Sequence, residues 1–329
     1  MSEGYKPAGG MPAPPRGLNM NERSSVVNRI AKGAGIAVTF STAMPRLGLA
    51  SLFICLLSGI ILSFYYRPFG NVFQNVEEIT SLVPYGWFFR QIHYITGQAF
   101  VFLMLFHTVD HFVRRRYRMY PAGEWTGLVT ALIACFLTLF TGFILKGDKE
   151  GLFAGTILLN MLDTIPMAGK WLSRIFVGSG DAFFFLPYLH HCLFLPVITA
   201  YLIRGHVSAW LPGKGFAAVA FVAAGTYAIL VDPFMDIPPE AQAQIVTGPW
   251  FFLGIQTLLK SWNPFYVGIL LPCVFVVLVL IIPAVSRFSG RESRFKAKSG
   301  IAEKGLYWAI LAASGAYLIL IVKALVNGP

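Results

Sequence analysis

Four histidines lie within or beside apolar segments of the sequence, and they form two pairs with almost equal spacing. His93 and His107 are 14 residues apart, and His191 and His206 are 15 apart. On an ideal helix these separations give rises of about 21 and 22 Å and angular offsets of about 40° and 60°. Each pair therefore presents imidazoles on one helix face at two heights. An imidazole in an apolar setting is a metal ligand, a proton carrier or a cavity residue.

The elements that carry these histidines belong to a membrane protein. Of 329 residues, 56% are hydrophobic and only 12% are charged, whereas soluble domains average about 25% charged. Apolar runs of spanning length occur at 47–66, 91–109, 125–145, 182–203, 215–231, 261–286 and 305–322. Because lipid-exposed backbone must satisfy its own hydrogen bonds, each run predicts a helix. The predicted fold class is an all-α membrane protein with seven transmembrane helices.

The distribution of basic residues predicts the topology. Residues 1–46 and the loops 110–124, 204–214 and 287–304 together carry 18 of the 26 Lys and Arg. This bias places the N-terminus in the cytoplasm and, after seven spans, the C-terminus on the outer side. The net charge of +11 is thereby explained without nucleic acid. We expect a multi-pass protein of a bacterial-type cytoplasmic (inner) membrane, with an interfacial arm at 1–46 and no cleavable signal.

Segments outside the seven spans are also informative. The apolar stretches 151–162 and 245–259 are too short to span and are predicted to be interfacial or re-entrant. The long outer segments 67–90, 146–181 and 232–260 are predicted to form ordered caps.

The predicted topology brings the two histidine pairs together. Spans two and four both run from outside to inside, so His93 lies level with His191 and His107 level with His206. Two facing imidazoles at one height are what axial ligation of a haem iron requires. The pairs therefore predict an outer and an inner haem b. The four cysteines stand singly, without CxxCH, so we expect no covalent haem c.

Other interpretations of the histidines differ in what they require. His190 and His206 project to nearly opposite helix faces, so His190 is interpreted as a packing or pocket residue. His111 follows His107 by one turn, beside a run of arginines, and is interpreted as interfacial. Structural imidazoles would need hydrogen-bond partners. A proton-relay transporter would need carboxylates within the spans, which carry essentially none.

The sequence resembles the cytochrome b family of quinol:cytochrome c oxidoreductases, especially its chloroplast and cyanobacterial form, in which the histidine spacings are also 14 and 15. The similar segments, in order, are "SGIILSFYYRP" (58–68), "YGWFFRQIH" (85–93), "LFTGFIL" (139–145), "DTIP" (163–166), "LHHCLFLP" (189–196) and "DPFMDIPPEAQAQIVTGPWFFLGIQTLL" (232–259). They cover roughly residues 40 to 290.

The resemblance implies a haem-binding four-helix core at 47–212 and a three-helix quinone-site region at 213–329. It implies two b haems per chain and a quinone or quinol as cofactors. Gly59, Gly127 and Gly142 match positions where porphyrin packs closely against helices, which a missing Cβ permits. Arg90 is a candidate partner for a haem propionate.

Two departures from the family pattern bear on the chemistry. The family's Pro-Glu-Trp-Tyr motif appears as "GPWF" (248–251), so Pro249 replaces a proton-accepting Glu. Trp250 and Phe251 remain candidate quinone contacts. Asp148 is a candidate proton carrier; weaker candidates for that role are Glu150, Asp232, Asp236 and Glu240. The cysteine that holds an extra covalent haem in chloroplast relatives is replaced by Ala43.

The resulting prediction is a dihaem cytochrome b subunit of a respiratory electron-transfer complex, which is not catalytic alone. It would pass electrons between menaquinol or ubiquinol and a partner on the outer face, either a Rieske-type iron–sulfur protein or a multihaem cytochrome c. Other membrane subunits, a homodimer and lipids complete the expected partners. The alternative is a haem-bearing anchor and electron conduit for a peripheral dehydrogenase or reductase.

Overall fold

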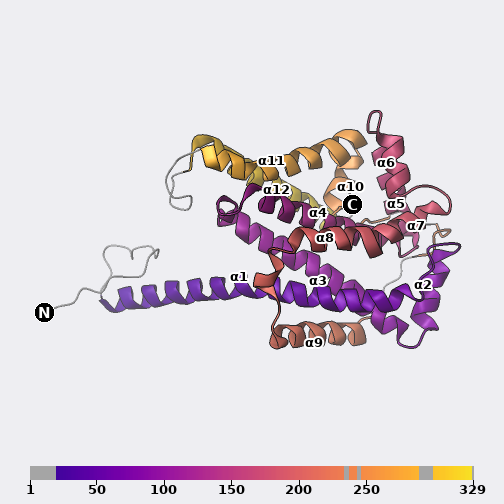
Figure 1. Cartoon of the computed structure of the whole chain (residues 1–329), viewed down its shortest axis with the longest axis horizontal. Helices are drawn as coiled ribbons and strands as arrows, with labels where there is room; N and C mark the ends of the chain where they lie inside the picture. The colour runs from indigo at the N-terminus through magenta and orange to yellow at the C-terminus, as the bar shows by residue number, and fades with distance from the viewer. Residues whose placement is uncertain (1–19, 233–236, 243–245, 289–298, 328–329) are drawn as a thin grey trace.

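The computed structural model describes residues 20–232, 237–242, 246–288 and 299–327, and within them every regular element is a helix (Figure 1). Six helical stretches in this part of the chain are long and apolar enough to cross a membrane: Phe40–Ser63, Gly86–Val113, Ala122–Ile144, Ala182–Ile203, Phe265–Ser286 and Ile301–Val326. The other predicted span, α9 (Lys214–Leu230), has 17 residues, at the short end of the spanning range of about 17 to 25. The prediction of an all-α, multi-pass membrane fold is confirmed.

Four spans form a bundle. They are α1 (Met20–Ser63), α3 (Gly86–Val113), α4 (Ala122–Ile144) and a composite span made of α7 (Ala182–Leu189), η2 (His190–Phe194) and α8 (Leu195–Ile203). α1 packs along α3, and α4 packs along α8. α9 contacts α1 and α3, and α11 (Leu271–Phe288) contacts α4 and α12 (Ile301–Asn327). Figure 1 shows α9 and the α11–α12 pair on opposite sides of the bundle.

The boundary of the predicted N-terminal arm differs from the start of the first helix. α1 begins at Met20, and Pro45 lies inside it. The helix therefore continues through the second half of the 1–46 segment, and Figure 1 shows its first turns projecting beyond the bundle. Residues 1–19 lie outside the described part of the chain.

The composite fourth span contains a π turn, which changes the spacing between its two haem-ligand candidates, His191 and His206. His190–Phe194 is π-helical, and the Leu195 amide donates to the His190 carbonyl, five residues back. A π turn accommodates one residue more than an α turn. This extra residue explains why His191 and His206 are 15 apart while His93 and His107 are 14 apart. The span ends at Ile203, so His206 lies in the turn before η3 (Val207–Trp210).

Short helices occupy the three long loops that were predicted to be ordered. They are α2 (Val72–Ser81), α5 (Lys149–Asp163), α6 (Gly169–Phe176) and α10 (Leu253–Leu259). Asn71 caps α2 by accepting from the Gln74 amide at 3.0 Å, and Asp148 caps α5 in the same way. With 15 and 7 residues, α5 and α10 are too short to cross a bilayer. The described parts of these loops contain helices as predicted, while residues 233–236 and 243–245 lie outside the described part of the chain. The depth of the loops in the membrane stays a prediction.

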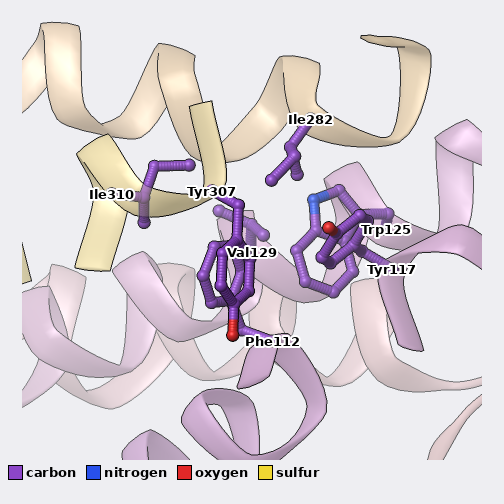
Figure 2. Packing of buried hydrophobic residues seen from close by; sticks show 7 residues of the cluster. All are labelled: Phe112, Tyr117, Trp125, Val129, Ile282, Tyr307 and Ile310. Carbon is purple, nitrogen blue, oxygen red and sulfur yellow. The ribbon is translucent and has the colours of Figure 1, made fainter. Parts of the chain in front are cut away.

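A buried cluster joins the bundle to the two C-terminal helices (Figure 2). It consists of Phe112, Tyr117, Trp125, Val129, Ile282, Tyr307 and Ile310. Phe112 and Tyr307 stack with ring centroids 5.3 Å apart, and the Trp125 indole donates to the Val279 carbonyl at 2.9 Å.

A polar network lies beside this cluster. Arg118, in the turn η1 (Arg116–Arg118), pairs with the fully buried Glu303 of α12 at 2.6 Å. The hydrogen bond to Glu303 raises the pKa of the Arg118 guanidinium, and Tyr117 also donates to Glu303 at 2.8 Å. The α3–α4 connection is thus fixed to α12.

Candidate functional site

We name the two heights of the bundle after the membrane sides that the sequence predicts for them: the outer level holds His93 and His191, and the inner level holds His107, His111 and His206. At the outer level, the ring centroids of His93 and His191 lie 5.9 Å apart, with the planes at 73°. A metal–imidazole bond is about 2 Å long and the ring centre lies about 1 Å behind the nitrogen, so two imidazoles on one metal ion have centroids roughly 6 Å apart. The outer pair therefore has the separation that one iron requires.

Backbone carbonyls fix both outer rings. His93 Nδ1 lies 2.9 Å from the Cys55 carbonyl of α1, and His191 Nδ1 lies 2.8 Å from the Thr138 carbonyl of α4. An Nδ1–H that donates to a carbonyl sets the tautomer and leaves Nε2 as the nitrogen that can bind a metal. The two neighbouring helices hold the pair in the same way.

Each outer ring also lies over a glycine. A Cβ at Gly59 would come within 2.7 Å of His93 Cε1, and a Cβ at Gly142 within 2.6 Å of His191 Cε1. The carbonyl acceptors Cys55 and Thr138 lie four residues before these glycines, one helical turn away. Gly127 differs. A Cβ added there would have the Leu202 carbonyl oxygen as its nearest non-local atom, at 3.6 Å, which is an ordinary packing distance between α4 and α8.

The inner level is held differently. His107 and His206 have centroids 6.2 Å apart, again the separation for one iron. His107 is 8% exposed, and neither of its ring nitrogens has a hydrogen-bond partner within the described residues. His206 Nε2 accepts from the Trp210 indole at 3.0 Å, and its Nδ1 lies 3.8 Å from Glu124. Burial lowers the pKa of His206, against the opposing effect of Glu124, which favours the neutral imidazole that metals bind.

A cavity of about 90 Å³ opens between the helices at this level. All three inner histidines line it, with apolar side chains such as Leu49, Phe100 and Val129. Unpartnered imidazole nitrogens on the wall of an apolar cavity suit a haem chemically, because a metal would complete the nitrogens and the wall offers apolar surface. The residues present therefore fit the group that the sequence predicts.

The two other histidines lie in contrasting places. His190 packs against Phe176 and Phe194, with centroids 5.2 and 5.6 Å away, as expected for a packing residue. His111 is 4% exposed, and its ring centroid lies 4.2 Å from that of His107. It therefore faces the bundle interior, and its predicted depth at the membrane interface stays a prediction. The i, i+4 spacing places it on the cavity-lining face of α3.

Candidate residues at the outer end have local partners. Arg90 donates to Thr80 of α2 at 2.9 Å. Asp148 is fully buried, accepts from the Gly151 amide at 2.9 Å and pairs with Lys146 at 2.7 Å. Its position is thus accounted for by capping α5 and by an ion pair.

The "GPWF" segment bridges the bundle and the C-terminal helices. The Trp250 indole donates to Gln98 of α3 at 2.9 Å, and the Phe251 ring lies 5.3 Å from that of Phe136 on α4. Tyr317 of α12 donates to the Phe251 carbonyl at 2.5 Å. The segment brings two aromatic rings against the bundle, where a flat apolar ligand can be stacked.

The weaker carboxylate candidates are dispersed. Glu150 accepts a hydrogen bond from Thr247, two residues before Pro249. Asp232 and Glu240 are exposed, and Asp236 lies outside the described residues.

Sequence reasoning missed three contributors to the histidine levels: the carbonyls of Cys55 and Thr138, and the indole of Trp210. Trp210 follows His206 by four residues, a spacing that signals contact in a helical turn. The carbonyls leave no direct mark in the sequence. Their indirect signal is a hydroxyl residue followed by glycine, at Ser58–Gly59 and Thr141–Gly142.

Comparisons with known proteins agree with this geometry. A family model described as cytochrome b/b6/petB matches residues 35–210. Cytochrome b of Myzostoma seymourcollegiorum is 25% identical over 304 residues, covering 79% of this chain and 76% of the relative. Cytochrome b6 of Euglena gracilis is 28% identical over 154 residues, covering 45% of this chain and 71% of the relative.

A solved structure described as a hyperthermophilic respiratory Complex III shares the fold. The TM-score is 0.58 at 15% identity, with 88% of this chain and 92% of the other covered. The family model covers more than half of the chain and all four paired histidines. Haem b and quinone are the groups that this family binds. The chain belongs to the cytochrome b/b6 family.

Proposed function

We propose that the chain is a dihaem cytochrome b subunit of a membrane electron-transfer complex, passing electrons between quinol or quinone in the bilayer and a redox partner at the outer face. The observation that carries this proposal is the outer pair, whose rings lie 5.9 Å apart with both Nδ1 atoms against carbonyls. A second pair at 6.2 Å, His107 on α3 and His206 in the turn after the composite span, supports a second haem.

In this function, His93 and His191 would hold the outer haem, and His107 and His206 the inner one. Bound haem supplies reversible one-electron chemistry. The protein supplies position and environment. The outer carbonyls hold two imidazoles as neutral Nε2 ligands, Gly59 and Gly142 admit their rings, and the apolar helices exclude water. Gly127 and Arg90 stay candidates for haem packing and propionate binding.

Trp250 and Phe251 are the proposed quinone contacts, and Asp148 is the proposed proton carrier. The two rings lie at the junction of α3, α4 and α12, which supports a site for a flat apolar head group. Asp148 is buried beside Lys146, so it would exchange a proton only if that ion pair opened.

The proposed assembly follows from the chemistry of the single chain. The chain would span a bacterial-type cytoplasmic membrane with its N-terminus inside and its C-terminus outside. A Rieske-type protein or a multihaem cytochrome c would receive electrons at the outer face, and other membrane subunits and a second copy of the chain would complete the complex. With Ala43 at the position of the family's covalent attachment, two non-covalent b haems are the proposed complement.

A second candidate function is a haem-bearing anchor that conducts electrons for a peripheral dehydrogenase or reductase. Pro249 favours it, because proline can neither accept nor relay the proton that a quinol must lose. The two functions separate in one assay on the purified native complex. Quinol-dependent reduction of an outer cytochrome or iron–sulfur partner supports the first, and a co-purified catalytic subunit that works without quinol oxidation supports the second.

The haem assignment is tested by a dithionite-reduced minus oxidised spectrum with pyridine haemochrome quantitation. We expect about two b haems per chain in the wild type, no c-type signal, and about one in His191→Ala. A wild-type protein without haem would contradict the proposed function.

A further inference from the structure

His111 gives the inner level a third imidazole where one iron needs two. Its ring centroid lies 6.2 Å from that of His206, the same distance that separates His107 from His206. The two α3 rings are 4.2 Å apart, so both approach His206 from one helix. His206 is the common member of two pairs with equal centroid separations, whose ring planes meet at 48° and 86°.

The nitrogens of His111 are disposed as those of an iron ligand should be. Its Nδ1 faces the Tyr120 hydroxyl at 3.4 Å, while its Nε2 is buried and has no hydrogen-bond partner in the described part of the chain. The outer histidines have the same pattern, with Nδ1 fixed by a carbonyl and Nε2 left to bind a metal. His107 has neither nitrogen partnered among the described residues, so no contact fixes its tautomer.

A buried nitrogen without a partner does not by itself identify a ligand, because His190 Nδ1 is also unpartnered among the described residues although its ring packs against Phe176 and Phe194. An unpaired buried polar atom has an energetic cost, and what distinguishes His111 is its place beside His107 on the wall of the cavity that His206 also lines. One ligand removes this cost for one ring only. If the iron could bind either ring, a buried nitrogen of His107 or of His111 would gain a partner.

We propose that His111 is an alternative axial ligand of the inner haem, able to replace His107 opposite His206. This inference rests on the proposed dihaem function. The exchange breaks one iron–nitrogen bond and forms another, without change in the oxidation state and without a proton lost. The inner haem would thus have two ligand sets, whereas the outer haem would have one, because His190 packs against Phe176 and Phe194.

The test compares His107→Ala, His111→Ala and the double variant, each as the full chain in its native complex. Haem per chain is measured by pyridine haemochrome, and the ligand set by electron paramagnetic resonance of the oxidised protein. We expect about two low-spin haems in each single variant and about one in the double variant. Added imidazole should restore the second low-spin haem in the double variant.

His93→Ala is the matched control, because the additional imidazole beside the outer pair, His190, packs against Phe176 and Phe194; the variant should retain about one haem. If His107→Ala retains about one haem, or a high-spin inner haem, His111 is not a ligand and the inference is overturned. His107→Gln, which preserves more of the side-chain volume, gives the same test if His107→Ala does not assemble. A wild type without haem would instead overturn the proposed function.

Discussion

The outer and inner levels use the same residue type in opposite ways. At the outer level, two imidazoles are each held by a carbonyl and each lie over a glycine. At the inner level, three imidazoles converge on a cavity, and His107 has no hydrogen-bond partner among the described residues. The outer level is preorganised by backbone atoms, whereas at the inner level His206 and His111 contact side chains, Trp210 and Tyr120. The difference predicts that equivalent substitutions act unequally at the two ends.

The largest expected effect is at an outer glycine. In Gly142→Ala, the new Cβ would lie 2.6 Å from His191 Cε1, and the ring can move away only by leaving the Thr138 carbonyl. We expect the haem content to fall from about two to about one per chain, measured by pyridine haemochrome. Gly127→Ala is the control on the same helix, because its Cβ would lie 3.6 Å from the nearest non-local atom; it should keep both haems. Equal haem content in both variants would contradict the proposed preorganisation.

The next effect concerns the ion pair beside the inner level. Glu303→Leu would leave Arg118 buried without its carboxylate, and removing one partner of a buried pair costs about 3 to 5 kcal/mol. We expect a large drop in the midpoint of thermal unfolding in detergent, with the outer haem spectrum unchanged below that midpoint. Glu78→Leu, which removes an exposed pair with Arg67, is the control and should shift the midpoint little. A similar small shift in both would show that the α12 contact does not stabilise the bundle.

The smallest effect is expected at Trp210. Its indole donates to His206 Nε2, the nitrogen that an iron would take. Trp210→Phe keeps an aromatic ring and removes the hydrogen bond by which the indole would compete with the iron for His206 Nε2. Such a bond is worth about 1 kcal/mol. We expect the variant to retain both haems and, in reconstitution of the haem-depleted protein, to bind the inner haem as tightly as the wild type or up to several-fold more tightly. Loss of the inner haem would mean that the indole positions His206 instead.

Much of the fold was predictable because lipid restricts it to apolar helices of a certain length. The predicted spans and the facing histidines follow from hydropathy and from 14- and 15-residue spacings. The one-residue difference between those spacings was not interpretable, because the π turn at His190–Phe194 leaves no hydropathy signal. The start of α1 at Met20 was also missed, since the polar 1–46 segment lacks the apolar run that marks a span.

The sites were only partly predictable, for a related reason. Histidine and glycine are visible in the sequence, whereas the carbonyls of Cys55 and Thr138 act through the backbone, and any residue supplies a carbonyl. For His111, the neighbouring arginines predicted its depth in the membrane and said nothing of the cavity that its ring lines. Its direction is decided by the helical phase that it shares with His107. Asp148 shows another limit: its residue type suggested proton transfer, which stays a proposal, while its capping of α5 and its ion pair with Lys146 became visible only in the structure.

Potentiometric titration of the purified complex, followed at the haem b absorption band, tests the central claim most directly. Two haem sites with unlike surroundings should titrate as two one-electron components of about equal amplitude. His93→Ala should remove one component and leave the other near its wild-type potential. A single wild-type component with the amplitude of one haem, or loss of both components in His93→Ala while the protein stays folded, would contradict two independent histidine levels.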